Sequence, residues 1–207
     1  MKDRFSESLW ARTDTPSKWH RFMFHDWANP SRYLAFYLVS DHYWKKERKY
    51  RFAEIGFGDA WDFRFGWKQM HDKGYIDYTG YEITANFALY AAVEFPNYNF
   101  QQGGFLDLER DAYDITYTRH TFEHIEPMLW RKCLARLLRA TKELCIITWY
   151  MPPGHGKAMR KNWKDWGDYG SWQNRYHRPD VLKVIDGLGW CPTFWEVGTN
   201  EVWALEK

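Results

Sequence analysis

Short apolar runs alternate with longer amphipathic segments along most of this chain. The short runs are bounded by Gly, Pro or Asp and predict strands, whereas the longer segments carry apolar residues at helical spacing. Strands are expected at 51–56, 75–82, 98–102, 113–118 and 144–149, and helices at 59–73, 84–95 and 127–141. Strands that alternate with helices of this length indicate βαβ units, whose right-handed crossovers wind helices onto both faces of a parallel sheet.

The C-terminal part departs from this alternation. A short helix is expected at 179–188, and two strands at 193–197 and 201–205 flank the turn residues Gly198-Thr199-Asn200. The sequence therefore predicts an α/β fold with a doubly wound, mostly parallel seven-stranded sheet and a C-terminal antiparallel hairpin. Such a hairpin distinguishes this topology from the plain dinucleotide-binding fold.

The N-terminal part has a different composition. Residues 1–50 contain no glycine, and 31–50 have apolar residues near helical spacing. We expect 1–50 to form a helical lid or flanking layer, and 51–207 to form the Rossmann-like domain. With 207 residues the chain is expected to be a single domain overall.

Bulk composition excludes several classes of protein. Aromatic residues make up 20% of the chain, which predicts a thick aromatic core with a few rings left for a ligand pocket. A net charge of +2 does not demand nucleic acid or a membrane surface. Three widely spaced cysteines argue against a zinc ribbon or disulfide scaffold. Neither a signal peptide nor a membrane helix is recognisable, so we expect a cytoplasmic protein without a membrane partner.

The strand expected at 51–56 contains an acidic residue near its end and leads into a Gly-x-Gly turn, in the sequence Glu54-Ile-Gly56-Phe-Gly58. Glycines at a strand–helix junction allow a sharp turn and a close approach of ligand to backbone. The nicotinamide fingerprint requires Gly or Ala where this chain has Trp61. Asp59 and Asp62 at the helix start would repel a pyrophosphate. The pattern favours a cationic ligand without phosphate.

A second acid closes the next strand, in Gly80-Tyr-Glu82-Ile83-Thr84. A carboxylate in this position can accept both hydroxyls of a ribose. The alternative is a carboxylate that caps the following helix.

These segments, with Tyr113-Asp-Ile-Thr-Tyr-Thr-Arg-His120 after the fourth strand, resemble successive motifs of class I S-adenosylmethionine-dependent methyltransferases, most closely the small-molecule group. The resemblance covers about half of the chain, roughly 50–153. It implies S-adenosyl-L-methionine as cofactor. It also implies that Glu54 lies near the methionine amino group, that Gly56 and Gly58 form the floor, that Glu82 holds the ribose and that Ile83 packs on the adenine.

The loop after the third strand departs from that family. The acid that binds the adenine amino group there falls on Gly104 in this chain. Either Asp107 substitutes from a shifted loop, or backbone groups near Phe105 make the contact. We therefore include Gly104 and Phe105 among the expected cofactor-binding residues.

His120, Glu123 and His124 follow the fourth strand at i, i+3, i+4 spacing. Two imidazoles and a carboxylate on one helical turn are a possible metal set, to be completed by His155 or His177. Glu-His at this place also occurs in the family without metal, and we expect no metal here. We expect His120 to lie beside the cofactor and to be the general base, with Tyr117 and Tyr150 as weaker candidates.

The sequence leaves the acceptor open. The first hypothesis is an enzyme that methylates a small-molecule or glycan-like acceptor at oxygen or nitrogen, as a monomer or homodimer. The second is an RNA methyltransferase, suggested by tryptophans among lysines and arginines within 154–177. The third is a cofactor-binding pseudoenzyme, motivated by the missing acid at Gly104.

Overall fold

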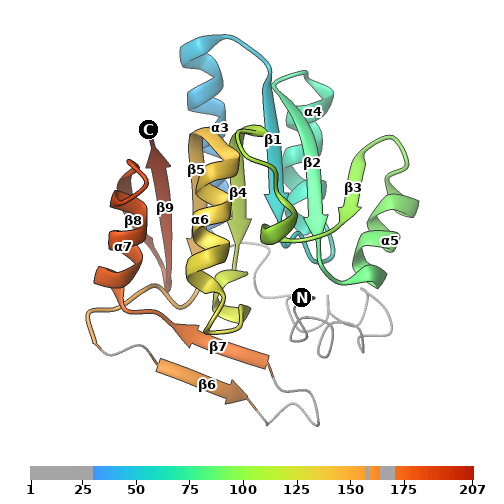
Figure 1. Ribbon diagram of the computed structural model, residues 1–207. Helices are drawn as coiled ribbons and strands as arrows, with labels where there is room; N and C mark the ends of the chain where they lie inside the picture. Colours follow the sequence, from blue (N-terminus) through green and yellow to red (C-terminus); the bar gives the residue numbers. More distant parts are fainter. Residues whose placement is uncertain (1–29, 157–158, 164–170) are drawn as a thin grey trace.

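The computed structural model describes residues 30–156, 159–163 and 171–207, with side chains in 30–156 and 173–207. Its main sheet has the strand order β3-β2-β1-β4-β5-β9-β8 (Figure 1). The strands are β1 (Tyr50–Ile55), β2 (Ile76–Glu82), β3 (Asn99–Gln102), β4 (Tyr113–Arg119), β5 (Thr141–Trp149), β8 (Cys191–Val197) and β9 (Asn200–Glu206). Strands β1 to β5 pair in parallel, whereas β9 runs antiparallel to β5 and β8. This confirms the predicted sheet and its C-terminal hairpin.

Helices cover both faces of the sheet, as predicted. One face carries α3 (Pro30–Lys46), the π-helical turn η2 (Phe63–Trp67) that continues into α4 (Lys68–Asp72), and α5 (Ala85–Glu94). The other carries α6 (Trp130–Ala140) and α7 (Arg178–Asp186). Single 3₁₀ turns η3 (Phe105–Asp107) and η4 (Phe122–His124) follow β3 and β4.

Aromatic side chains dominate both halves of the core. Trp67 and Tyr78 are fully or almost fully buried on the α3–α5 face, and Trp149 and Trp203 are buried on or beside the α6–α7 face. Their rings lie 4.4 to 6.2 Å from neighbouring rings, for example Phe52 to Trp67 at 4.5 Å. Edge-to-face and tilted contacts at such distances stabilise an aromatic core.

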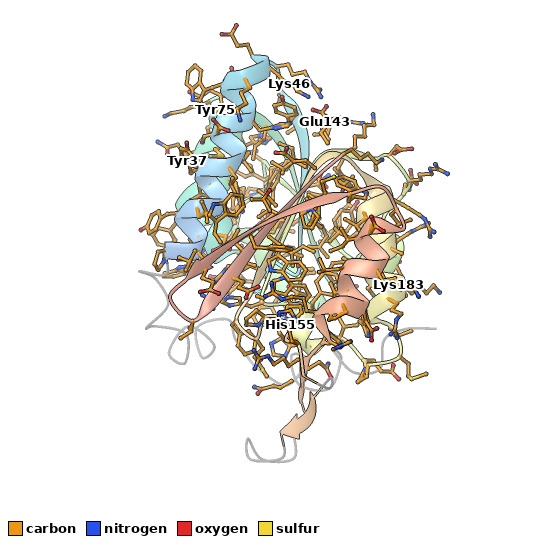
Figure 2. The ribbon with its side chains drawn as sticks, turned by 90° about the vertical axis from the view of Figure 1, so that its left-hand side faces the viewer. Tyr37, Lys46, Tyr75, Glu143, His155 and Lys183 are labelled. Carbon is orange, nitrogen blue, oxygen red and sulfur yellow. The ribbon has the colours of Figure 1, made fainter. Side chains whose placement is uncertain are left out.

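Helix α3 is the part of the 1–50 region that the structure describes. Ala35 and Val39 are fully buried against the sheet face. A side chain at Gly66 would place its Cβ 2.1 Å from the Phe36 ring, so the absence of a side chain there lets α3 and η2 pack closely. Figure 2 shows α3 running along the molecule with Tyr37 and Lys46 on it. The described part is thus a flanking layer, and 1–29 lie outside the described residues.

The basic run at 45–51 lies at the amino-terminal edge of the sheet. Lys46 and Arg48 bond to Glu143, and Lys49 lies 3.6 Å from Asp77. Figure 2 places Lys46 and Glu143 at the end of the molecule opposite His155. These cations are therefore paired with acids, and they lie away from the carboxyl-terminal edge.

Two local expectations were wrong. No strand was expected within 154–177, but β6 (Met159–Trp163) and β7 (Ser171–Arg175) form a separate antiparallel pair. This pair lies outside the main sheet. Strand β5 begins at Thr141 rather than 144, because the Thr141 hydroxyl donates 2.8 Å to the Leu137 carbonyl and ends α6. Among the described helices, none has both the length and the apolar character required to cross a bilayer.

Candidate functional site at the carboxyl edge of the sheet

The loop after β1 makes a tight, left-handed turn. Gly56, Gly58 and Ala60 have φ values of 77°, 56° and 60°. A Cβ at Gly56 would lie 2.5 Å from the Thr121 hydroxyl oxygen, so this glycine is required both by φ and by the close approach of the loop after β4. The Gly56 N–H donates to the Tyr81 carbonyl at 2.8 Å, which ties the turn to the end of β2.

Glu82 joins this turn to the next loop. It is buried, with only 6% of its surface exposed, and its Oε2 accepts the Gly58 N–H at 2.9 Å. Its Oε1 accepts the Thr84 N–H, also at 2.9 Å, at the start of α5. Burial raises the pKa of Glu82, and the two backbone hydrogen bonds oppose that shift. The carboxylate thus binds the N–H of Thr84, the residue before α5, and also faces the glycine turn.

The loop after β3 completes one side of the edge. The Gly103 N–H donates to the Glu82 carbonyl at 3.0 Å, and the position of a Cβ on Gly104 lies 3.8 Å from Ile83 Cδ1. Phe105 is buried 4.8 Å from the Phe122 ring. Gly104 stands where the family has an acid. Here the carboxylate of Asp107 is used within the loop, because its Oδ2 accepts the Gly104 N–H at 2.8 Å and closes the turn.

Glu54 is buried just before the turn. Its Oε2 accepts the hydroxyl hydrogen of Tyr78 at 2.6 Å, and only 3% of the residue is exposed. Burial, together with the negative charge of Asp62, raises the pKa of Glu54 to about 8. The side chain that the resemblance places near the cofactor's amino group therefore lies beneath the loop and is largely protonated at neutral pH.

Asp62 forms a buried ion network that the sequence did not reveal. It bonds to Arg32 of α3 and lies 2.8 Å from Arg119 Nε, while the Tyr117 hydroxyl donates to it at 2.8 Å. Burial alone would raise the pKa of Asp62, but Arg119 and Arg32 lower it overall.

Two expectations change because of this network. The Asp62 charge is compensated by two arginines, so it does not act as a bare anion at the helix start. Tyr117 is fully buried, and burial holds the pKa of its hydroxyl well above the ordinary value. A phenol that donates to a carboxylate and resists ionisation is unsuited to act as a base. Of the arginines in this network, Arg119 alone carried a signal in the sequence, because it ends β4 at the edge where ligands bind.

His120 lies at the end of β4 in the left-handed region, with φ of 52°. Its N–H donates to the Thr148 carbonyl at 2.9 Å. The Nε2 atom is buried and has no hydrogen-bond partner. Burial lowers the pKa of His120 well below its usual value, so the imidazole is neutral at physiological pH. A non-glycine residue in this conformation is held by its surroundings, which is common at functional sites.

Glu123 and His124 do not complete a metal site. Glu123 is fully buried, and its Oε1 accepts the N–H groups of Tyr150 at 2.8 Å and Met151 at 3.2 Å. His177 lies 3.6 Å from Asp180. Across the described side chains, no three His, Cys, Asp or Glu gather closely enough to hold a metal ion. Burial raises the pKa of Glu123 to about 7, and its backbone donors oppose that shift.

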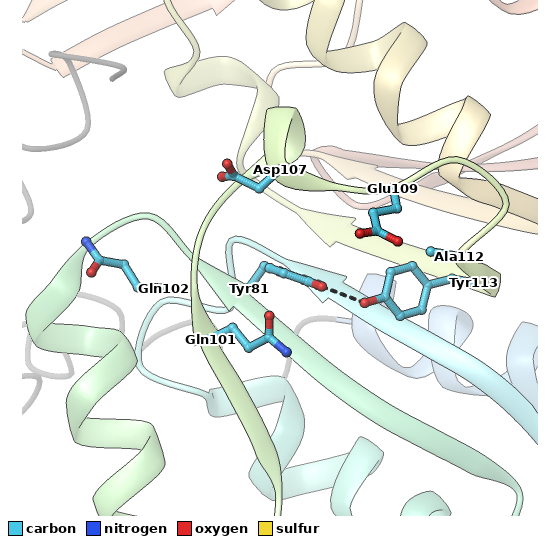
Figure 3. Close-up of a pocket in the computed structure, with 7 residues that line it drawn as sticks. All are labelled: Tyr81, Gln101, Gln102, Asp107, Glu109, Ala112 and Tyr113. Carbon is cyan, nitrogen blue, oxygen red and sulfur yellow. Dashed lines mark hydrogen bonds between the residues drawn. The ribbon is translucent and has the colours of Figure 1, made fainter. Parts of the chain in front are cut away.

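A polar hollow of about 440 Å³ lies beside β2 and the η3 loop (Figure 3). Within it, the hydroxyl groups of Tyr81 and Tyr113 form a hydrogen bond of 2.6 Å. Of the residues considered above for the cofactor, Asp107 lines this hollow, whereas Glu54, Gly56, Gly58, Glu82, Ile83, Gly104, Phe105 and His120 do not. The expected cofactor residues lie at the carboxyl ends of β1 and β2 and in the loops that follow β1, β2, β3 and β4. The structure thus brings Gly56, Gly58 and Glu82 together there, with the other expected residues on the adjoining loops.

The arrangement of strands and loops is that of class I S-adenosylmethionine-dependent methyltransferases. The 1,6-didemethyltoxoflavin-N1-methyltransferase of Burkholderia thailandensis, with bound S-adenosylhomocysteine, is similar over 100% of this chain and 90% of its own, with a TM-score of 0.70 and 13% identity. Magnesium protoporphyrin IX methyltransferase from Synechocystis PCC 6803, with bound S-adenosylmethionine, is similar over 99% and 92%, with a TM-score of 0.63 and 9% identity.

The same fold also occurs in an enzyme with a different reaction. The [4+2]-cyclase SpnF is similar over 80% of this chain and 60% of its own, with a TM-score of 0.53 and 13% identity. No family model matches the chain, and no curated protein matches it by sequence. At these identities the likeness establishes the fold.

Proposed function

We propose that this protein binds S-adenosyl-L-methionine and transfers its methyl group to a small-molecule or glycan-like acceptor, at oxygen or nitrogen. The observation that carries the proposal is the joint position of the Gly56–Gly58 turn and the Glu82 carboxylate at the ends of adjacent parallel strands. Ligands of open α/β sheets bind at this edge.

The residues at this edge suit the adenosyl part of the cofactor. The glycine turn leaves room for close approach, and Glu82 offers a buried carboxylate to two ribose hydroxyls. Ile83 and the backbone of Gly104 and Phe105 would flank the adenine. Because Asp107 already binds the Gly104 N–H, backbone groups of this loop are the better candidates for the adenine amino group.

The methionine part would lie toward Glu54, over the buried charges beneath the turn. When bound, the cofactor supplies an electrophilic methyl group on a sulfonium. The protein's own part is to hold the acceptor in line and to exclude water. His120 is neutral and its Nε2 has no partner, so it can accept a hydrogen bond from the acceptor. Burial disfavours a positively charged imidazolium at His120. Complete transfer of the acceptor's proton to His120 is therefore costly.

Two other functions are compatible with the same fold and the same candidate site. A protein that binds the cofactor but performs no methyl transfer is supported by the similarity to a cyclase and by Gly104 in place of the family's acid. The RNA hypothesis depends on lysines, arginines and tryptophans within 157–172, whose side chains lie outside the described residues.

Calorimetric titration with S-adenosylhomocysteine tests the proposal. We expect saturable binding with one site per chain, and displacement by S-adenosylmethionine. NAD at the same concentration should give no heat of binding. Absence of S-adenosylhomocysteine binding would overturn the proposal.

A second measurement separates the acceptor classes. Methyl transfer from labelled cofactor to pooled small molecules supports the first function, whereas tight binding without transfer to any acceptor favours a protein that has lost transfer. An RNA acceptor would show affinity that falls steeply with salt concentration.

A further inference from the structure

Four unpartnered polar atoms belong to residues at, or within four positions after, the ends of β4 and β5. Within the described residues, His120 Nε2, Glu123 Oε2, Thr148 Oγ1 and the Tyr150 hydroxyl are buried and have no hydrogen-bond partner. Glu123 is fully buried and Thr148 is 1% exposed. Buried polar groups in native proteins are normally satisfied, so a cluster of orphans calls for a polar ligand or for water.

The backbone around this cluster is firmly held, which argues against a chance arrangement. Glu123 Oε1 accepts the N–H groups of both Tyr150 and Met151. Asn174 of β7 donates to the carbonyls of Glu123 at 3.0 Å and Ile125 at 2.7 Å. Glu123 thereby fixes the start of the loop after β5 and leaves its second oxygen unused.

Three rings lie beside the cluster. The Tyr150 ring lies 5.4 Å from the His120 ring in an edge-to-face arrangement, and 5.8 Å from the His124 ring with a 32° tilt. Aromatic faces attract other planar rings, so a planar ligand is favoured beside Tyr150.

The unpartnered atoms define the chemistry of the ligand. Nε2 of a neutral imidazole is either a donor or an acceptor, depending on the tautomer, and a tyrosine hydroxyl is both. A neutral hydroxyl satisfies either state. A carboxylate offers no donor, so it cannot pair with Nε2 when that nitrogen is an acceptor, and the buried Glu123 carboxyl disfavours a second negative charge nearby.

We propose that the methyl acceptor presents an uncharged hydroxyl on a planar ring, a phenol, to His120 Nε2 and the Tyr150 hydroxyl. This inference rests on the proposed methyltransferase function and names the substrate class of that site. His120 and Tyr150 would bind and orient the phenol, and Glu123 is a positioning residue that holds Tyr150.

The test uses nuclear magnetic resonance of the full chain with ¹⁵N-labelled histidine, saturated with S-adenosylhomocysteine. Three probes of similar shape are titrated: p-cresol, p-xylene without the hydroxyl, and 4-methylbenzoate with a charge. The His120 ring signals are assigned by their loss in His120→Gln. We expect p-cresol to shift them saturably and to bind several-fold more tightly than either other probe.

Two matched variants sharpen the result. Tyr150→Phe removes one hydroxyl and should weaken p-cresol binding about five-fold, the effect of one hydrogen bond. Tyr113→Phe removes a hydroxyl in the hollow beside η3 and should leave p-cresol binding unchanged. Equal or tighter binding of 4-methylbenzoate, or unchanged binding in Tyr150→Phe, would overturn the inference.

The failures of the two proposals are distinguishable. Calorimetry on the same sample reports S-adenosylhomocysteine binding first, and its absence overturns the function. If S-adenosylhomocysteine binds but p-cresol leaves the His120 signals unmoved, the cluster binds water only and the phenol inference is wrong.

Discussion

The Glu82 carboxylate holds the backbone N–H of Gly58 at 2.9 Å, and this bond links the end of β2 to the turn after β1. The other oxygen of the same carboxylate holds Thr84 at the start of α5. One buried side chain thus fixes two loops at the edge where a nucleoside ligand is expected. The loop geometry and the proposed ribose contact therefore depend on the same group.

Glu82→Gln should weaken S-adenosylhomocysteine binding by about 10- to 100-fold, because hydrogen bonds to a charged group contribute about 1.5–3 kcal/mol. Calorimetry gives the dissociation constants. Glu94→Gln on α5 is the matched control, since Glu94 bonds to Arg64 on the outer side of the helix. Equal affinities for Glu82→Gln and the wild type would remove Glu82 from the site.

Gly56→Ala and Gly74→Ala compare two glycines with the same φ of 77°. Gly74 has open space around its Cβ position, so alanine there should cost only the strain of the left-handed conformation, about 1–2 kcal/mol. At Gly56 the new Cβ also collides with Thr121. We expect greater destabilisation in urea and loss of S-adenosylhomocysteine binding. Similar unfolding free energies for the two variants would show that the Thr121 contact relaxes freely.

Glu54→Gln should flatten the dependence of stability on pH. The folded pKa of about 8 exceeds the ordinary value of 4.5, so the folded state keeps a proton that the unfolded state releases. The contribution of Glu54 is fully present below pH 4.5 and is lost as pH rises to about 8. Glutamine still accepts the Tyr78 hydroxyl but does not titrate.

Urea unfolding of Glu54→Gln at several pH values measures this effect. Glu109→Gln, which makes the same change at an exposed position, is the matched control. A Glu54→Gln protein whose stability declines with pH as steeply as the wild type would contradict the assignment.

Asp62→Asn should be strongly destabilising, because it leaves Arg32 and Arg119 buried without their anion. Breaking a buried ion pair in this way typically costs about 3–5 kcal/mol. Asp77→Asn breaks an exposed pair with Lys49 and should cost no more than about 1 kcal/mol. Urea unfolding compares the two. A small effect at Asp62 would mean that water reaches the network.

The sequence by itself determined the fold and the turn that carries the proposed site. Strand length, helical spacing and Gly56 and Gly58 are local features of the sequence. A backbone that turns sharply after a buried strand requires glycines, and these are recognisable in the sequence. The acid at Glu82 was found for the same reason, since its position follows from the end of a strand. The terminal hairpin was likewise marked by its turn residues.

Only the tertiary structure decided how the buried charges pair. Arg32 lies 30 positions from Asp62 in sequence, and Arg119 lies 57 positions away, so no local pattern links them. The β6–β7 pair was missed because strands outside the main sheet need not alternate. Burial set the protonation of Glu54 and His120, because the cost of charging a group depends on the neighbours that folding brings to it.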